Sequence, residues 1–274
     1  MTDRLPVLNS GTGTPLVLLH AFPLSARMWQ RQLAELPGRD GTEARVLAPD
    51  LRGFGAASQG DDEPSLDLLA DDVALLLDRT GIERAVVGGL SMGGYVAMAF
   101  ARRHADRLAG LLLADTKATP DTEQARANRE RIARAVLARD SVQLLLDEQL
   151  PHPQLGAATA RERPEVVRQV RELTAQASPA AVAWAQRAMA ARGDSLEVLA
   201  GVAVPALVVV GEEDAITSVA DARAMADVLP DAELRTVPRA GHLTALEDPA
   251  AFNTAVRSLL ARTASAALRS RPQG

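Results

Sequence analysis

The chain has 274 residues, of which 47% are hydrophobic and 24% are charged, so it can bury the core of one sizeable globular domain with an inserted lobe. It contains no cysteine, which excludes disulfides, thiolate zinc sites and cysteine nucleophiles. The net charge of -5 comes without a basic stripe, which argues against nucleic acid as a partner.

No targeting or membrane segment is visible in the sequence. The segment Met1–Pro6 lacks the charged start and apolar stretch of a signal peptide, and no apolar run approaches the roughly 20 residues that a membrane span needs. We therefore expect a cytoplasmic protein that makes no contact with a membrane. The sequence leaves the oligomeric state open.

The first 116 residues alternate short apolar runs with amphipathic segments. Runs that are apolar on both faces are typical of buried parallel strands, and apolar residues at helical spacing indicate helices packed on them. One short strand fits before Pro15, around residues 5–7. The strands predicted after it are 16–20, 45–48, 84–87 and 108–114, and the predicted helices are 28–36, 66–79 and 92–103.

The rhythm changes between residues 117 and 200, where strand-like runs vanish and patterns of Arg, Glu, Ala and Leu predict about four helices. We interpret residues 117–200 as a helical cap inserted into a core of residues 1–116 and 201–274. Alternating strands and helices in that core predict an α/β fold with a mostly parallel central sheet and helices on both faces. Its last predicted strands are 205–211 and 233–237, and its last helices are 221–229 and 249–261.

The segment Gly89-Leu90-Ser91-Met92-Gly93 joins a predicted strand to a predicted helix and matches the pattern G-x-S-x-G. In this pattern a sharp turn strains the serine backbone and projects its hydroxyl beyond the sheet. A side chain at Gly89 or Gly93 would collide with the turn, which is why both positions need glycine. The motif therefore predicts that Ser91 is a nucleophile.

A serine nucleophile needs a base that takes its proton, and the chain has four histidines. His242 follows the last predicted strand, at the carboxyl edge of the sheet, where α/β folds place ligands and catalytic groups. We therefore predict that His242 is the base. His20, by contrast, is interpreted as a buried histidine that braces an early loop.

The base in turn needs a carboxylate that orients it. Asp214 comes directly after a buried strand, and Ser91, Asp214 and His242 follow one another in the chain order that accompanies this motif. We therefore predict that Asp214 is the acid. Three other carboxylates remain open for this role: Asp115, Glu212 and Glu213.

The oxyanion that forms during acyl transfer needs N–H donors. One donor is the backbone N–H of Met92, which follows the nucleophile, and the other comes from the loop His20-Ala21-Phe22-Pro23, where Phe22 is the candidate. A later turn carries Asp50 and Arg52, which we expect to form a structural ion pair. No spaced set of His, Asp or Glu suggests a metal site.

With these residues in place, the chain resembles the α/β-hydrolase superfamily, in particular its group of 3-oxoadipate enol-lactonase-like enzymes and esterases. The resemblance runs from about Pro15 to Leu260. It implies an α/β-hydrolase fold, a cap over a triad of Ser91, His242 and Asp214, and no cofactor. The matching stretches are Leu18–Pro23, Pro49–Gly55, Gly89–Gly94, Val209–Asp214 and Ala240–His242.

Two features depart from that group. The segment before Pro15 has room for one strand where relatives have two, so the first strand of the family sheet is in doubt. Ala21 stands where the oxyanion loop usually has glycine.

The sequence therefore predicts a cofactor-free serine hydrolase that cleaves a small carboxylic ester or lactone through an acyl-enzyme on Ser91. The alternatives are a lyase or a cofactor-free oxygenase with the same fold and triad, and a binding protein with a vestigial site. Apolar cap residues that either line the acyl pocket or only hold the cap helices together are Leu144, Leu145, Trp184 and Met189. Cap arginines available to a substrate carboxylate are Arg126, Arg129 and Arg134.

Overall fold

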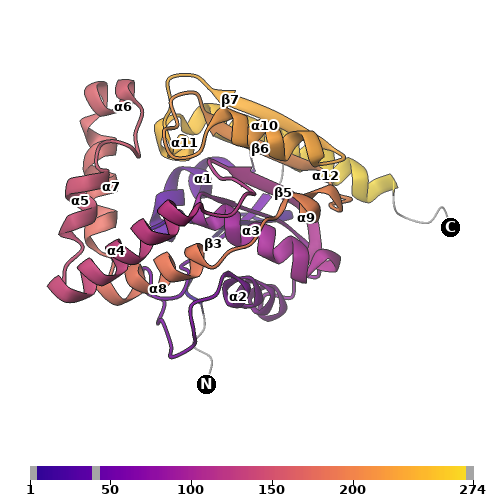
Figure 1. The fold of residues 1–274 in the computed structure, drawn as a ribbon. Coiled ribbons are helices and arrows are strands. Elements are labelled where there is room, and N and C mark those ends of the chain that lie inside the picture. The colour runs from indigo at the N-terminus through magenta and orange to yellow at the C-terminus, as the bar shows by residue number, and fades with distance from the viewer. Residues whose placement is uncertain (1–4, 39–43, 270–274) are drawn as a thin grey trace.

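The computed structural model describes residues 5–38 and 44–269, which are built around one seven-stranded sheet (Figure 1). The strands lie in the order β1-β3-β2-β4-β5-β6-β7. Only β1 runs antiparallel to its neighbour, and the other pairs are parallel. Residues 1–4 of the N-terminal segment discussed above lie outside the described residues. The strand bounds are β1 Val7–Ser10, β2 Thr14–Leu19, β3 Ala44–Pro49, β4 Ala85–Leu90, β5 Leu108–Ala114, β6 Ala206–Gly211 and β7 Ala232–Val237.

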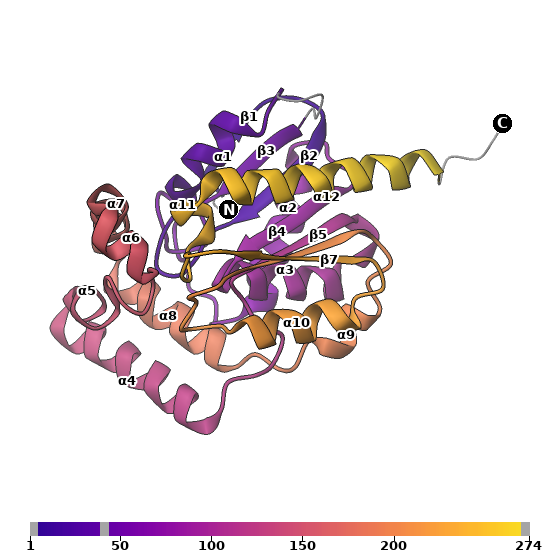
Figure 2. The same ribbon diagram turned by 90° about the horizontal axis from the view of Figure 1, so that it is seen from above.

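Helices cover both faces of the sheet (Figure 1, Figure 2). Val17 of β2 packs into a cluster with α2, α3 and α10, whereas the neighbouring Leu16 packs into a second cluster with α1 and α12. Successive strand residues point to opposite faces, so strands covered on both sides are apolar throughout. The helix bounds are η1 Ala26–Trp29, α1 Gln30–Glu35, α2 Leu66–Arg79, α3 Met92–Arg103, η2 Ala105–Arg107, α10 Val219–Val228, α11 Thr244–Glu247 and α12 Pro249–Arg269.

The α/β fold with a mostly parallel central sheet and helices on both faces, which the sequence predicts, is confirmed. The elements α2, α3 and β5 have the predicted bounds. Helix α2 begins where the Ser65 hydroxyl accepts the N–H groups of Asp67 and Leu68, and it ends before Gly81, whose φ of +66° suits glycine. The one strand that fits before Pro15 is β1, at Val7–Ser10, and it pairs with β3.

The segment between β5 and β6 contains six helices, where the sequence pattern indicates about four. Two of them, α6 and α9, have only six and five residues, which is too short to show a periodic pattern. Helices α4 and α8 pack against each other, whereas α9 packs on α3 and α10 of the core. In Figure 2, α4 to α8 form a layer to one side of the sheet. Their bounds are α4 Glu123–Arg139, α5 Gln143–Gln149, α6 Ala157–Glu162, α7 Pro164–Ala175, α8 Pro179–Ala190 and α9 Leu196–Ala200.

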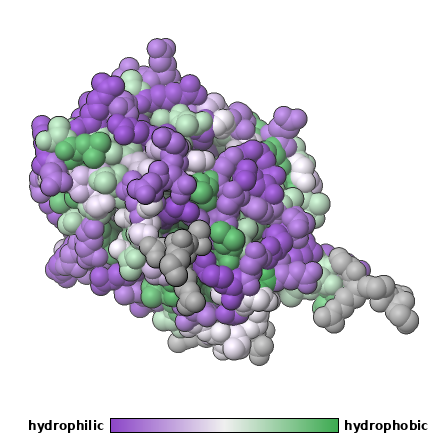
Figure 3. Space-filling model, turned by 90° about the horizontal axis from the view of Figure 1, so that it is seen from below, coloured by the Kyte–Doolittle hydropathy of each residue, from purple (hydrophilic) through white to green (hydrophobic). Residues whose placement is uncertain are grey.

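The surface seen in Figure 3 is mainly hydrophilic, with small, separate hydrophobic areas. The large hydrophobic residues that are most exposed lie on different elements: Leu8, Leu75, Leu137, Ile216 and Leu268. Single exposed apolar side chains are normal on a protein surface. Among residues 5–38 and 44–269, no helix has the length and apolar character required to cross a membrane.

Candidate active site

Ser91 occupies the turn between β4 and α3 with φ 56° and ψ -112°, a conformation that costs an L-residue backbone strain. The turn is tight on both sides. A Cβ at Gly89 would lie 2.3 Å from the carbonyl carbon of Gly93, and a Cβ at Gly93 would lie 2.1 Å from the carbonyl oxygen of Leu19. Both positions therefore require glycine, and the strained turn presents Ser91 at the carboxyl edge of the parallel strands.

The structure brings Ser91, His242 and Asp214 into one hydrogen-bonded chain. His242 Nε2 lies 2.8 Å from Ser91 Oγ, and His242 Nδ1 lies 2.8 Å and 3.0 Å from the two carboxylate oxygens of Asp214. The His242 and Asp214 side chains are almost fully buried. In this arrangement the Nδ1–H donates to the carboxylate, which leaves Nε2 as the acceptor for the serine proton.

Asp214 is held by the loop that follows it. Its Oδ1 accepts the N–H groups of Ile216 and Thr217, and its Oδ2 accepts the Thr217 hydroxyl at 2.7 Å. Burial raises the pKa of Asp214, but the neighbouring His242 and the hydrogen bonds from Thr217 outweigh it and bring the pKa below its usual value. Asp214 is therefore ionised at neutral pH and places a negative charge beside the His242 imidazole.

Asp115, the alternative acid, is buried behind the same loops and makes no contact with His242. Its Oδ1 accepts the Gly211 N–H at 3.0 Å, and its Oδ2 accepts the N–H and hydroxyl of Thr244 at 3.1 Å and 2.5 Å. Burial, reinforced by the nearby charge of Asp214, raises the pKa of Asp115 well above its usual value. The geometry thus gives the position beside the imidazole to Asp214 and a supporting position to Asp115.

The loop after β2 brings Phe22 to the edge of the site, where its side chain lines a cavity together with Ser91 and His242. Neither the Phe22 N–H nor the Met92 N–H donates to another group in the part of the chain that the structure describes. Met92 is buried and Phe22 is half-buried. N–H groups that lack a protein acceptor and lie near a serine hydroxyl are suited to an oxyanion.

His20 fixes the base of that loop. Its Nε2 accepts the Leu51 N–H at 3.0 Å, so its Nδ1 carries the proton and donates to the Ala21 carbonyl at 3.0 Å. Complete burial lowers the pKa of His20 from 6.5 to about 4. His20 therefore braces the loop as a neutral side chain, as the sequence suggests.

The expected ion pair between Asp50 and Arg52 is wrong. Arg52 reaches back to α2 and binds Asp72 through two nitrogens, at 2.5 Å and 2.9 Å. Asp50 instead accepts the backbone N–H groups of Ala26 and Ala56. Both residues still serve the scaffold, because Asp50 joins two turns and Arg52 ties its own turn to a helix.

A cavity of about 330 Å³ opens at the Ser91 hydroxyl, between the carboxyl edge of the sheet and the inserted helices. Of the four apolar residues considered for a pocket, Met189 lines this cavity and the other three do not. Leu145 is buried among the core residues, Leu144 is half-buried, and Trp184 donates its Nε1–H to the Asp62 carbonyl at 2.9 Å. The side chains that line the cavity from the inserted segment also include Ile132, Glu148, Gln154 and Gln186.

Of Arg126, Arg129 and Arg134, only Arg129 lines the cavity. Its Nε donates to the buried carboxylate of Asp121 and its Nη1 donates to Gln186 Oε1 at 2.9 Å, whereas its Nη2 has no acceptor among the described residues. Asp121 also pairs with Arg192, at 2.7 Å. Although burial opposes ionisation, the two arginines lower the pKa of Asp121 to about 2. Two cations thus share one carboxylate next to Ser91.

The model of the family described as alpha/beta hydrolase fold matches residues 14–249. The chain belongs to this family. It is 28% identical over 247 residues to 3-oxoadipate enol-lactonase 2 of Acinetobacter baylyi, an alignment that covers 90% of this chain and 88% of the relative. Among solved structures, it is 40% identical to a thermophilic esterase from Thermogutta terrifontis (malate bound), with a TM-score of 0.90 and coverage of 94% and 93%. For the enol-lactonase from Burkholderia xenovorans LB400 the identity is 29%, the TM-score is 0.83, and the coverage is 94% and 96%.

This α/β-hydrolase also joins its inserted segment to the His242 loop, a connection that the sequence does not indicate. The Gln154 carbonyl accepts the backbone N–H of His242 at 3.1 Å. The buried Glu247 carboxylate accepts the N–H of Gly156 at 2.9 Å and the N–H groups of Gly241 and Leu243 at 3.0 Å and 3.1 Å. The bonds involve backbone groups, so no pattern of residue types could have predicted them.

The remaining acidic candidates, Glu212 and Glu213, lie away from the imidazole of the hydrolase. Glu213 Oε2 accepts the N–H of Ala157 at 2.6 Å, and Glu212 Oε2 accepts the N–H of Arg239 at 3.3 Å. Within residues 5–38 and 44–269, no group of three or more His, Cys, Asp or Glu is arranged to hold a metal ion.

Proposed function

We propose that this α/β-hydrolase is a cofactor-free serine hydrolase that cleaves a small carboxylic ester or lactone. The observation that carries the proposal is the chain Ser91–His242–Asp214, with heavy-atom distances of 2.8 Å at each link. A histidine that touches both a strained serine and an ionised carboxylate can take the serine proton at neutral pH. The esterase and enol-lactonase among its relatives support this class of reaction.

The reaction follows from the geometry in two halves. Ser91 Oγ attacks the substrate carbonyl while His242 Nε2 takes its proton, and the N–H groups of Phe22 and Met92 stabilise the oxyanion. His242 then protonates the leaving alkoxide, and the acyl group stays on Ser91 as an ester. A water that gives its proton to His242 attacks this ester. The second oxyanion then collapses, His242 passes that proton to the departing Ser91 Oγ, and the acid is released.

Residues 117–200 are proposed as the cap of this enzyme, on a core of residues 1–116 and 201–274. The support is that the cavity at Ser91 takes much of its wall from α4, α8 and the loop around Gln154. A cavity of about 330 Å³ fits a small ester with short chains. The cap therefore sets which acyl and alcohol groups can reach Ser91.

Arg129 points to substrates that carry a carboxylate besides the ester group. The guanidinium lines the cavity and keeps Nη2 available, while Asp121 has a second arginine as partner. A ligand carboxylate would therefore restore local charge balance and gain a charge-assisted hydrogen bond. The malate in the related esterase, a molecule with two carboxylates, supports this reading.

The test is Ser91→Ala on a p-nitrophenyl butyrate assay. We expect kcat to fall about 10⁶-fold with an unchanged melting temperature, because the nucleophile is lost and the scaffold is kept. His242→Ala should be nearly as damaging, and the double variant little worse than either. Ser265→Ala, on the far end of α12, is the matched control and should keep full activity.

Two results would contradict the proposal. One is a Ser91→Ala variant that retains more than a tenth of kcat. The other is a folded wild-type protein that turns over no member of a panel of activated esters and lactones, which would favour a lyase or a cofactor-free oxygenase on a non-ester substrate. A fluorophosphonate that adds its mass to the tryptic peptide of Ser91 would identify the nucleophile independently of any substrate.

A further inference from the structure

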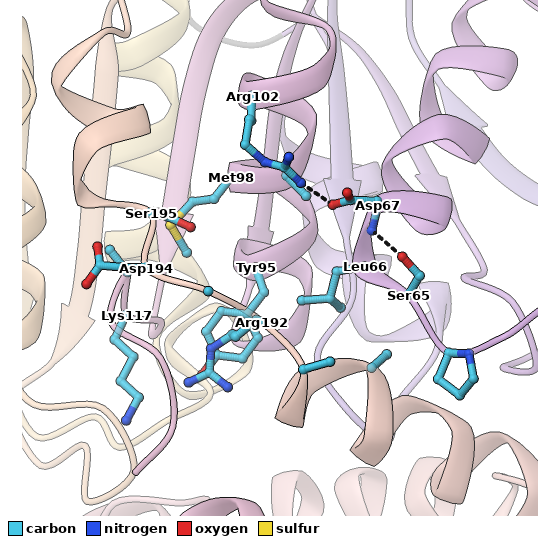
Figure 4. Close-up of a pocket in the computed structure, with 16 residues that line it drawn as sticks. Ser65, Leu66, Asp67, Tyr95, Met98, Arg102, Lys117, Arg192, Asp194 and Ser195 are labelled. Atoms are coloured by element: carbon cyan, nitrogen blue, oxygen red, sulfur yellow. Dashed lines mark hydrogen bonds and ion pairs between the residues drawn. The ribbon is translucent and has the colours of Figure 1, made fainter. Parts of the chain in front are cut away.

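A second cavity, of about 440 Å³, lies beside the Ser91 cavity and exceeds it in volume. It is bounded by the start of α2, by α3 and by the turn between α8 and α9 (Figure 4). Figure 4 shows Lys117, Asp194 and Ser195 on one side and Ser65, Leu66 and Asp67 on the other, with Tyr95 and Arg192 between them. Its apolar lining includes Leu66, Met98, Ala99, Ala118, Ala188 and Ala191.

Arg192 is a buried cation of this cavity with an unused donor. Its side chain is only 6% exposed, and its guanidinium lies 4.1 Å from the centre of the Tyr95 ring. Nη1 donates to the Met189 carbonyl and Nη2 donates to Asp121, whereas the buried Nε has no hydrogen-bond partner. Because neighbouring atoms cover the Nε, a molecule in the cavity does not reach it, and Arg192 acts on the cavity through its positive charge.

Lys117 is a second cation without a partner. It is the one lysine of the sequence, it is half-buried, and it lines the same cavity. Within the described ranges it makes no hydrogen bond and no ion pair. Asp194, on the same side, accepts the Leu196 N–H at 2.8 Å and lies beyond ion-pair distance of Lys117.

The other charged pair of the lining is already balanced. Arg102 binds Asp67, and Asp67 is also within 3.6 Å of Arg103. The cavity thus combines an apolar wall with the cations of Lys117 and Arg192 and the carboxylate of Asp194. Lys117 has no acceptor among the described residues, and the Arg192 Nε, which also has none, is covered by neighbouring atoms. A bare inorganic anion would use only the cations, whereas an anion with a short alkyl chain would use both parts of the lining.

We propose that this cavity is a second small-molecule site, which binds the anion of a short-chain carboxylic acid. The carboxylate pairs with Lys117 in the field of the buried Arg192 cation, and the alkyl chain lies over Leu66 and Met98. Tyr95 lines both cavities, and Asp121 joins Arg192 to Arg129 at the Ser91 cavity. The second site therefore adjoins the proposed catalytic one without sharing its nucleophile, and its existence is independent of the reaction at Ser91.

The single lysine allows a direct test that needs no turnover. Reductive methylation with ¹³C-formaldehyde labels Lys117 and the N-terminal amine, and it keeps the positive charge of both. On titration with hexanoate we expect the dimethyl-Lys117 NMR signal to shift and to saturate. Ala125→Trp, which fills the Ser91 cavity from α4 and does not line the second one, should leave this shift unchanged, and that separates the two sites.

Two variants test the two parts of the lining. Ala191→Trp fills the cavity from an exposed position and should abolish the saturable shift. Lys117→Met, examined by calorimetry, should weaken hexanoate binding at least tenfold. Hexylammonium has the same alkyl chain and the opposite charge. If the site selects anions, hexylammonium produces no saturable shift of the dimethyl-Lys117 signal. This control uses the wild-type protein and so does not depend on the folding of any variant.

The proposal is overturned by any of three results. These are a shift that grows linearly with hexanoate, a shift that is the same in Ala191→Trp, and equal binding of hexanoate, hexylammonium and inorganic phosphate. Because every readout is binding, failure here leaves the serine hydrolase proposal untouched, and inactivity on esters leaves this site untouched.

Discussion

Asp115 Oδ2 accepts the hydroxyl of Thr244 at 2.5 Å, two residues beyond His242 in the chain. The other oxygen of Asp115 holds the Gly211 N–H at the end of β6. Asp115 thus fixes the loops of both Asp214 and His242 from behind, without touching the imidazole.

This division of roles between the two aspartates is testable. Asp214→Asn should lower kcat about 10⁴-fold at an unchanged melting temperature, because the imidazole loses its orienting anion. Asp115→Asn should lower the free energy of unfolding by about 1–3 kcal/mol, since one of its acceptors becomes a donor facing Thr244, and should change kcat less than tenfold. Kinetics and urea unfolding of both variants check this. A crippled kcat in a fully stable Asp115→Asn, with a mild Asp214→Asn, would transfer the role of the acid to Asp115.

Arg129→Met should discriminate between substrates by their charge. For a p-nitrophenyl half-ester of a dicarboxylic acid we expect kcat/KM to fall about 10- to 100-fold, since a charge-assisted hydrogen bond in a partly buried site is lost. For p-nitrophenyl butyrate the loss should be small. Arg126→Met, on the same helix but exposed and away from the cavity, is the matched control. Equal losses on both substrates would remove the carboxylate from the proposed substrate class.

Met189 and Trp184, on the same helix, should respond differently to truncation. Met189→Ala enlarges the cavity and should raise the ratio of kcat/KM for octanoyl over butyryl esters roughly tenfold. Trp184→Ala should leave that ratio unchanged and lower the melting temperature, because its ring is buried and its N–H bonds to Asp62. An altered acyl preference in Trp184→Ala would place that ring at the substrate.

His20 should make the folded protein less stable as the pH falls. Its pKa of about 4 in the folded protein lies below the usual value of 6.5, so the unfolded chain binds its proton first as the pH falls. Stability from this residue is complete above pH 6.5 and declines toward pH 4, by about 3 kcal/mol. We therefore expect the stability gap between wild type and His20→Gln to narrow from pH 7 to pH 4.5 in urea unfolding. A pH-independent gap would contradict this, and the exposed His152→Gln serves as control.

Much of the core could be read from the sequence because its signals are local. Helix α2 shows its capping serine, its apolar spacing and its terminal glycine within seventeen residues, Ser65 to Gly81, and β5 is an unbroken apolar run. Helix α11, in contrast, has four residues that are held by contacts with distant segments, and so it leaves no periodic pattern. The split of the inserted segment into six short helices is hidden for the same reason.

The candidate site, too, has residues that the sequence could predict and residues that it could not. Ser91, Asp214 and His242 each follow a strand of the parallel part of the sheet, so the rule that parallel strands gather their carboxyl ends at one edge suffices to bring them together. The sequence of α8 does not indicate which of its apolar residues face the cavity, because apolar residues occur along its whole length, Met189 and Trp184 among them. Glu247 could not be found because it acts on backbone N–H groups.

The bonds from Gln154 and Glu247 to the His242 loop bear on how such enzymes can be recombined. A chimaera that exchanges the whole segment between β5 and β6 for that of a relative would discard the carbonyl that holds the His242 N–H and the Gly156 N–H that Glu247 binds. The graft would thus perturb His242, the proposed general base, even if every core residue were kept. A chimaera that exchanges the inserted helices but keeps residues 150–157 of this chain would retain both bonds. Its substrate specificity could then change without a change in the position of the His242 imidazole.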